Sequence, residues 1–314
     1  MGPSAHSPHV WESGGVTTVG QLLTELSVAF RNAGIQNAAV DAELLTAHVL
    51  QETRGRVQTL AVLDSQLAEQ ALTRIRELAA ERVRRVPLQH LTGKAPFRQL
   101  ELAVGPGVFV PRPETETVAE LAISAARSAQ PDPLIAVDLC TGSGTLALAL
   151  VNEVPNVRVL AVEKSPEAHA WASRNVAQYG EGRVTLLLGD IAELDAQEES
   201  ERTPLAEQFA PLEGRVSLVV SNPPYVPESM VPRDPEVRDH DPALALYSGA
   251  DGLDLIRVIS RVAQRLLAVG GVLVIEHAET QGEAIRALLT RDGWLRAETH
   301  QDLTLRDRAT TAIR

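Results

Sequence analysis

Hydrophobic residues in the first quarter of the chain recur with the spacing of an α-helix. The pattern runs through segments 17–34, 37–51 and 64–85, and the first of these stops at Gly34. The apolar face of that first segment consists of Leu22, Leu23, Leu26 and Phe30. Apolar residues three or four positions apart form one stripe along a helix, and that stripe must be buried against a neighbour. We therefore predict a small all-helical domain over residues 16–85.

From about residue 116 onward the pattern changes to short apolar runs that alternate with helical segments. Five runs are nearly continuous in Val, Leu and Ile, as expected of strands that are buried on both faces. They are 134–140, 157–165, 184–190, 216–222 and 271–277. Alternation of strands and helices is typical of a doubly wound, mainly parallel sheet. We predict an α/β domain over residues 116–314.

Three further stretches complete the predicted organisation. Residues 86–115 hold short β-type runs punctuated by Gly and Pro, which predicts a β-hairpin that joins the two domains. Residues 1–15 are small, polar and interrupted by Pro and Gly, so we expect a flexible tail. Residues 191–213 carry seven acidic residues and one arginine, and we expect a flexible acidic insertion there.

The charge balance narrows the possible functions. The chain has 41 acidic residues against 29 Lys and Arg, a net charge of −12 and a pI near 5.2. A protein that binds a nucleic-acid backbone needs clustered cations, and such an acidic surface disfavours this binding. The predicted helical domain is locally neutral, and a solvated helix end explains its basic cluster of Arg82, Arg84 and Arg85 most simply. We expect no direct specificity for nucleic acid.

The cysteine count and the hydropathy point to a cellular compartment. Cys140 is the only cysteine, so no internal disulfide can form, and a reducing compartment fits. This cysteine and the eight histidines lack metal-ligand spacing, and we expect no structural metal. No apolar run approaches the ~18 residues of a membrane span, and residues 1–15 lack the features of a signal peptide. We expect a cytoplasmic protein without a membrane segment and take a monomer as its simplest state.

The loop after the first predicted strand carries the first chemical signal. It reads DLCTGSG, in which Gly142 and Gly144 let the backbone approach a ligand and aim N–H groups at it. Asp138, Glu163 and Asp190 stand at three successive strand tips, where ligands of open parallel sheets bind. Each acid alone would be explained as a helix cap. Together they predict a site for a nucleotide-like cofactor.

The spacing within that loop distinguishes between cofactors. A dinucleotide site would read G-x-G-x-x-G, whereas positions 140, 142 and 144 are Cys, Gly and Gly and are followed by TLALA. A nicotinamide-dependent dehydrogenase is therefore disfavoured. The run D-L-x-T-G-S-G instead resembles the first motif of Rossmann-like S-adenosylmethionine methyltransferases. This resemblance implies S-adenosyl-L-methionine as the cofactor and a class I methyltransferase sheet as the fold.

The fourth predicted strand is followed by Asn222, Pro223, Pro224 and Tyr225. The two prolines hold the chain extended and leave carbonyl groups unpaired. A nitrogen conjugated with a π system is a poor nucleophile, and two hydrogen-bond acceptors can draw its lone pair toward a methyl donor. The Asn222 side-chain oxygen and the Pro223 carbonyl would be these acceptors, and Tyr225 would stack on the flat group. The segment predicts methylation of a planar N–H₂ group.

Several enzyme groups share the pattern (N/D)-P-P-(Y/F/W). They are DNA adenine-N6 and cytosine-N4 methyltransferases, some RNA guanine-N2 enzymes and protein glutamine-N5 methyltransferases. The rest of the chain separates them, because residues 85–116 closely resemble the hairpin of the release-factor glutamine methyltransferases, the PrmC/HemK family. Segments 41–50, 248–259 and 276–282 resemble the same family, so the resemblance covers roughly residues 17–314.

This resemblance implies a complete activity. A methyl group would pass from S-adenosylmethionine to the side-chain amide nitrogen (N5) of the glutamine in the Gly-Gly-Gln motif of bacterial class-1 peptide release factors, which the helical domain would dock. The implied catalytic and substrate-binding residues are Asn222, Pro223, Pro224 and Tyr225. The implied cofactor contacts are Asp138, Cys140, Thr141, Gly142, Ser143, Gly144, Glu163, Asp190, Ile191 and Asn222. Many relatives have Gly in place of Cys140 and an aromatic residue in place of Ile191, which weakens the expectation of adenine stacking at Ile191.

Two other functions stay open at this point. An adenine-N6 nucleic-acid methyltransferase should carry a basic target-reading domain, which the neutral helical domain does not supply. A non-catalytic module that binds S-adenosylmethionine would have lost residues such as Asn222 and Tyr225, which are intact. Glu114 and Glu116 have two equally supported interpretations. They order the hairpin and gate the pocket, or they simply complement the dipole of the following helix.

Overall fold

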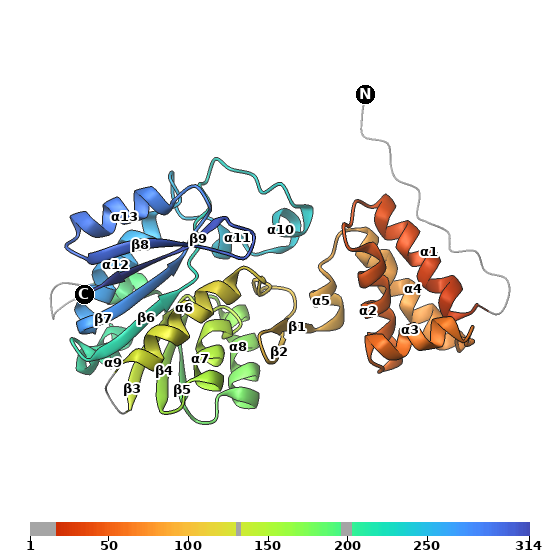
Figure 1. Cartoon of the computed structure of the whole chain (residues 1–314), viewed down its shortest axis with the longest axis horizontal. Helices are drawn as coiled ribbons and strands as arrows, with labels where there is room; N and C mark the ends of the chain where they lie inside the picture. Colours follow the sequence, from red (N-terminus) through yellow and green to blue (C-terminus); the bar gives the residue numbers. More distant parts are fainter. Residues whose placement is uncertain (1–16, 130–132, 196–202) are drawn as a thin grey trace. The chain divides into compact units, whose positions relative to one another are not determined.

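The chain divides into two compact units (Figure 1). The computed structural model describes residues 17–129, 133–195 and 203–314. The first unit comprises the chain up to Gly93 together with Asp234–His240, and the second comprises the remainder. The tail predicted at 1–15 lies outside the described residues.

Five consecutive helices make up most of the first unit. They are α1 (Val19–Asn32), α2 (Ala38–Leu50), α3 (Arg54–Val62), α4 (Glu69–Val83) and α5 (Leu88–Thr92). Thr18 and Gln21 form a capping box at the start of α1, in which each side chain accepts a hydrogen bond from the other's backbone N–H. Leu22, Leu26 and Phe30 are buried in the core, as the helical spacing predicts.

The first unit also contains a helix from far along the chain, α10 (Pro235–His240). Glu236 of α10 accepts hydrogen bonds from Arg82 Nη2 at 2.8 Å and from Arg85 Nε at 3.0 Å. Arg82 is buried, and its Nε also donates to Asp41 at 2.9 Å. The prediction of a solvated helix end is therefore wrong for two of the three arginines, because their guanidinium groups bind carboxylates from distant segments.

A seven-stranded sheet forms the centre of the second unit. Its order is β5-β4-β3-β6-β7-β9-β8, in which β5 to β7 are parallel and β9 is antiparallel to both of its neighbours. The strands are β3 (Leu134–Leu139), β4 (Val157–Glu163), β5 (Val184–Leu188), β6 (Val216–Ser221), β7 (Leu267–Glu276), β8 (Leu295–Gln301) and β9 (Asp307–Ile313). The predicted doubly wound, mainly parallel sheet is confirmed.

Helices cover both faces of this sheet, which is why its central strands are continuous apolar runs. One face shares a core with α6 (Thr115–Ser128), α7 (Thr145–Glu153) and α8 (Pro166–Tyr179). The other face shares a core with α9 (Pro204–Phe209), α12 (Asp254–Leu266) and α13 (Gly282–Arg291). A short helix, α11 (Ala243–Leu246), lies in the long connection between β6 and α12.

The predicted hairpin is present as β1 (Lys94–Phe97) and β2 (Leu100–Ala103). Phe97 lies opposite Leu100, so Arg98 and Gln99 form the turn. Arg98 has a positive φ of 51° and its backbone N–H donates to Glu116 Oε1 at 3.0 Å. Of the two interpretations of Glu116, this contact supports the one in which it orders the hairpin.

The predicted acidic insertion at 191–213 is ordered where the structure describes it. It contains the 3-10 helices η1 (Ile191–Asp195) and η3 (Ala210–Leu212) in addition to α9. Leu194, Leu205 and Phe209 are buried in the core of the second unit. Residues 196–202 lie outside the described residues. The prediction of a flexible insertion is wrong for the described part, because its apolar residues cover one face of the sheet.

Candidate active site

The glycine-rich loop connects β3 to α7 at the carboxyl edge of the parallel strands. Cys140, Gly142 and Gly144 have positive φ angles of 65°, 59° and 87°. This backbone conformation is unfavourable for a residue with a Cβ, so it is strained at Cys140 and easily adopted by the glycines. A Cβ added at Gly142 would meet no atom within 4 Å. The loop therefore leaves open space beside its backbone, as a ligand cradle requires.

Asp138 is fully buried beneath this loop. Its Oδ2 atom accepts hydrogen bonds from Thr141 Oγ1 at 2.6 Å and from the Ala147 N–H at 3.0 Å. Its Oδ1 atom has no hydrogen-bond partner within the described residues. Burial raises the pKa of Asp138 to about 7. The carboxyl group thus links the loop to the first turn of α7 through hydrogen bonds. Its burial disfavours the charged form of the group.

Glu163 ends β4 and joins two loops. Its Oε2 atom accepts a hydrogen bond from the Gly142 N–H at 2.8 Å, and its Oε1 atom accepts one from the Ser165 N–H at 2.8 Å. Burial raises the pKa of Glu163. Asp190, which follows β5, forms an ion pair with Lys164 Nζ at 2.6 Å. Partial burial acts to raise the pKa of Asp190, but this ion pair and a backbone N–H lower it overall.

The remaining predicted cofactor residues differ in exposure. Cys140 is half-buried, and burial raises the pKa of its thiol. Thr141 and Ser143 are buried within the loop. Ile191 is only 4 % exposed and packs in the core beneath the sheet. Its side chain therefore offers little surface to an adenine ring.

Asn175 of α8 is a residue that the sequence did not single out. Its Nδ2 donates to the Ser143 carbonyl at 2.9 Å and to the Ala103 carbonyl at 3.0 Å, while its Oδ1 accepts from the Ala103 N–H at 2.7 Å. The side chain is fully buried. Asn175 therefore fastens the glycine-rich loop to β2 of the hairpin. A lone asparagine within a helix carries no sequence signal for such a role.

The Asn-Pro-Pro-Tyr segment leaves the sheet beside the glycine-rich loop. Strand β6 pairs with β3 so that Ser221 lies opposite Leu139, and the Ser221 hydroxyl donates to the Leu139 carbonyl at 2.5 Å. Asn222 is the next residue on one strand and Cys140 is the next on the other. The parallel register therefore places side by side the two motifs that the sequence identified.

The polar groups of this segment have few partners. Asn222 Nδ2 lies 3.5 Å from Thr115 Oγ1, at the start of α6. Within the described part of the chain, no backbone group donates a hydrogen bond to the Pro223 carbonyl oxygen. The Tyr225 carbonyl accepts from Gln281 Nε2 at 2.9 Å, and burial raises the pKa of the Tyr225 hydroxyl. The segment is therefore held at its far end, and Pro223 is itself a buried residue.

A fourth acid lies at the same edge of the sheet. Glu276 is the last residue of β7 and is 1 % exposed. Burial raises the pKa of Glu276 to about 7. The segment 276–282 carries part of the family resemblance, but the sequence analysis did not assign a role to Glu276 itself.

The described residues contain neither a candidate metal centre nor a candidate membrane-spanning helix. Across 17–129, 133–195 and 203–314, no three His, Cys, Asp or Glu side chains are grouped so that they could hold a metal ion. No helix in those same ranges is both long enough and apolar enough to cross a bilayer.

Two family models match the chain. Residues 21–93 match the PrmC N-terminal domain, and residues 136–209 match a methyltransferase domain. The release factor glutamine methyltransferase of Streptomyces coelicolor is 47% identical over 93% of this chain and 97% of its own length. The enzyme of the same name from Mycolicibacterium smegmatis is 44% identical over 90% of this chain and 92% of its own length.

A relative named for a different activity is similar over nearly the full length. The 4-amino-L-phenylalanine/4-methylamino-L-phenylalanine methyltransferase of Streptomyces pristinaespiralis is 38% identical over 95% of this chain and 95% of its own length.

The covered parallel sheet, the glycine-rich loop at its edge and the methyltransferase-domain match define a class I methyltransferase that uses S-adenosylmethionine. The curated relatives then narrow this class. With identities above 40% over at least nine tenths of its length, the chain belongs to the release factor glutamine methyltransferase family.

Asp138→Asn should change how the stability of the protein depends on pH. The pKa of Asp138 is raised to about 7 from 3.8, so its stabilising effect is complete below the lower value and is lost as the pH rises through the higher one. The asparagine does not titrate. Between about pH 5 and pH 8 the wild type should therefore lose about 2 to 3 kcal/mol of unfolding free energy relative to the variant. The loss corresponds to ~1.4 kcal/mol per pH unit up to the higher pKa. Urea denaturation at both pH values measures this, and a difference that does not change with pH would contradict it.

Proposed function

We propose that this protein transfers the methyl group of S-adenosylmethionine to the side-chain amide nitrogen, N5, of the glutamine in the Gly-Gly-Gln motif of bacterial class-1 peptide release factors. Family membership over more than nine tenths of the chain carries this proposal. It also favours a cytoplasmic location, where release factors act and where a chain with a single cysteine fits.

The residues around the glycine-rich loop fit the cofactor. The backbone at Gly142 is open on its Cα side, and Glu163 and Asp190 stand at the two following strand ends. We assign the methionine part to the loop, the ribose to Glu163 and the adenine to the region of Asp190. The assigned cofactor residues are Asp138, Cys140, Thr141, Gly142, Ser143, Gly144, Glu163, Asp190, Ile191 and Asn222. For Asp138 the role is indirect, because its buried carboxyl group shapes the loop.

The Asn-Pro-Pro-Tyr segment supplies the acceptor side. S-adenosylmethionine provides an electrophilic methyl group on a sulfonium. An amide nitrogen becomes nucleophilic only when its lone pair leaves conjugation, and two acceptors placed on its hydrogens favour this. The Asn222 side-chain oxygen and the Pro223 carbonyl are the proposed acceptors, with Pro224 and Tyr225 enclosing the flat amide. No charged base is needed, because the alkylated nitrogen loses its proton readily.

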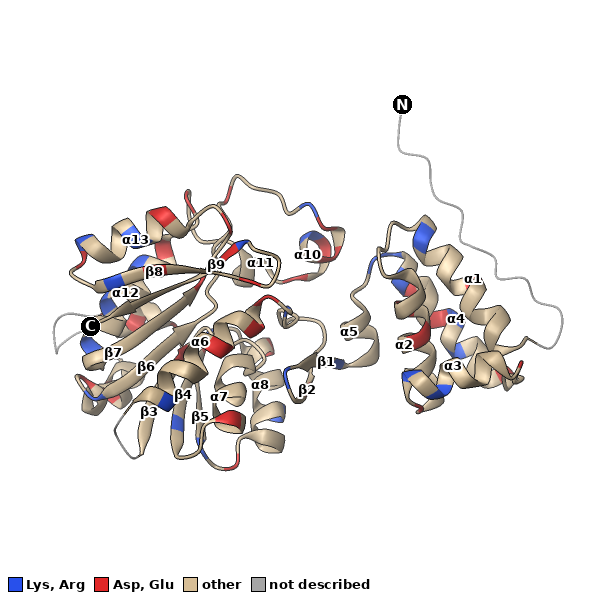
Figure 2. Cartoon of the chain, in the orientation of Figure 1, with Lys and Arg blue, Asp and Glu red and all other residues tan. Residues whose placement is uncertain are grey.

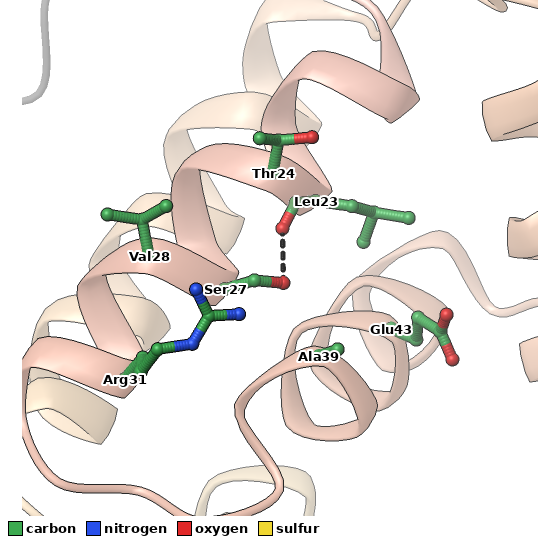
Figure 3. A pocket seen from close by; sticks show the side chains of 7 residues that line it. All are labelled: Leu23, Thr24, Ser27, Val28, Arg31, Ala39 and Glu43. Atoms are coloured by element: carbon green, nitrogen blue, oxygen red, sulfur yellow. Dashed lines mark hydrogen bonds between the residues drawn. The ribbon is translucent and has the colours of Figure 1, made fainter.

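The helical unit is the proposed docking domain for the release factor. A groove of about 300 Å³ lies between α1 and α2 within this unit (Figure 3). Its lining residues are Leu23, Thr24, Ser27, Val28, Arg31, Ala39 and Glu43. Val28 is 48% exposed, and the Ser27 hydroxyl is turned back to the Leu23 carbonyl at 2.6 Å. The groove combines apolar side chains with one arginine and one glutamate, and such a mixed lining suits the binding of a protein surface.

A nucleic-acid substrate is not supported. Blue and red residues are interspersed on the helices of the first unit and over the second unit in Figure 2, without a continuous basic face in that view. Proteins that hold a nucleic-acid backbone gather their cations on one face.

The activity is tested by incubating the purified protein with radiolabelled S-adenosylmethionine and a class-1 release factor. Label should enter the factor, and a factor whose loop glutamine is changed to alanine should remain unlabelled. Label that persists in the alanine variant would place the methyl group on another residue. Transfer to 4-amino-L-phenylalanine but not to the factor would favour the activity for which the Streptomyces pristinaespiralis relative is named, in which the acceptor is also a conjugated N–H₂ group.

Asn222→Ala should lower turnover far more than cofactor affinity. Loss of one polarising contact to the reacting group is expected to raise the barrier by about 2 to 4 kcal/mol. The kcat with release factor and the Kd for S-adenosylhomocysteine measure the two effects separately. Equal losses in both would move Asn222 from the acceptor site to the cofactor site.

A further inference from the structure

Glu276 and Asn222 end neighbouring parallel strands at the same level. Strands β6 and β7 pair so that Ser221 lies opposite Ile275. Asn222 follows Ser221 and Glu276 follows Ile275, so these two residues are neighbours as well. On its other side Glu276 pairs with Ala309 of β9. The backbone of Glu276 therefore lies between two neighbouring segments of the sheet, and the residue is almost completely buried.

This carboxyl group is not explained by its contribution to stability. Its Oε2 atom has no hydrogen-bond partner within the described residues. Burial raises the pKa of this group most strongly and Glu114 adds to that effect, whereas the nearby Thr115, Arg308 and Asn222 side chains lower it. Burying a carboxyl group with an unmatched oxygen costs free energy, and an apolar residue could fill the same space without that cost. Such groups are frequent at functional sites.

The contacts fix a direction for the Asn222 amide. Its Nδ2 donates toward Thr115 Oγ1 at 3.5 Å, and the Thr115 and Asn222 side chains both lie close enough to the Glu276 carboxyl group to lower its pKa. A hydroxyl has one proton, so Thr115 can give that proton to the carboxyl group and receive the amide N–H at the same time. If the Asn222 amide were flipped, its Oδ1 would face the side-chain oxygens of Thr115 and Glu276. The N–H₂ end is therefore held toward Thr115 and Glu276, and Oδ1 faces away from them.

We propose that Glu276, acting through Thr115 and directly, is a positioning residue that orients the Asn222 side chain so that its Oδ1 is presented to the acceptor amide. The inference rests on the proposed role of Asn222 as the group that accepts a hydrogen bond from the substrate nitrogen. Glu276 itself does not touch the substrate.

A double-mutant cycle tests this role. Glu276→Gln preserves the volume but offers an N–H₂ group that can bind the Asn222 oxygen, so the asparagine can turn. The kcat should fall by about 10- to 100-fold, as expected for a small displacement of a reacting group, while KM and the Kd for S-adenosylhomocysteine change by less than about 2-fold. In an Asn222→Ala background, Glu276→Gln should change kcat by less than about 2-fold, because the group that it positions is absent.

Companion variants keep the test decisive if Glu276→Gln folds poorly. Thr115→Val should lower kcat in the same way, whereas Thr115→Ser, which keeps the hydroxyl, should restore it. Glu279→Gln is the matched control, because this glutamate is exposed and three residues further along the chain. Its kcat should equal that of the wild type.

The outcomes separate this inference from the proposed function. The cycle is measured with whichever acceptor the wild type methylates, the release factor or 4-amino-L-phenylalanine. Equal losses from Glu276→Gln with and without Asn222 would show that Glu276 acts elsewhere, and the inference would be wrong although the activity stands. A wild type that methylates neither acceptor would overturn the proposed function and this inference with it.

Discussion

The parallel register of three adjacent strands determines the chemistry of this protein. Leu139 of β3 lies opposite Ser221 of β6, and Ser221 lies opposite Ile275 of β7. One residue beyond this row, the chain enters the glycine-rich loop, the Asn-Pro-Pro-Tyr segment and Glu276. Shifting any of the three strands by one residue would turn its side chains to the opposite face of the sheet and separate these groups. The apolar cores on both faces hold the register, because each strand is buried on both sides.

The acids at this edge divide into two kinds. Asp138 and Glu163 use their oxygens to hold backbone N–H groups and a hydroxyl of the loops, so they shape the cradle from below. Asp190 is more exposed and balanced by Lys164. Glu276 is buried with an oxygen that lacks a partner within the described residues. Burial of Asp138 and Glu276 disfavours their charged forms, and in the roles proposed for them both carboxyl groups place other groups accurately for methyl transfer.

The sequence predicts the elements that are strongly apolar and fails for those that are not. The five parallel strands were predicted from their apolar runs, which the central strands bury on both faces, whereas β5 at the edge has no fully buried residue. Strands β8 and β9 carry polar residues along much of their length, so no apolar run revealed them. Helix α3 buries only Val57, which leaves no periodic stripe. Glu236 of α10 forms an ion pair with Arg82, although the two residues are about 150 positions apart in the chain. Local sequence patterns cannot predict such a contact.

For the candidate site, the sequence placed the predicted residues at strand ends but could not predict the directions of their side chains. Asp138 was placed correctly at a strand end, yet only the loop conformation shows that it points beneath the loop. Glu276 ends a strand in the same way, and the reasoning about acids at strand tips would have found it if applied to the fifth strand. Asn175 had no comparable signal, because its partners lie on β2 and on the glycine-rich loop.

The most direct test of the central claim is a crystal structure of the protein with S-adenosylhomocysteine and a peptide that contains the Gly-Gly-Gln motif. The glutamine amide nitrogen should lie about 3 Å from both the Asn222 Oδ1 and the Pro223 carbonyl oxygen, facing the sulfur of the cofactor. A complex in which the amide is bound elsewhere, or in which Asn222 Oδ1 is turned toward Thr115 and Glu276, would contradict the account.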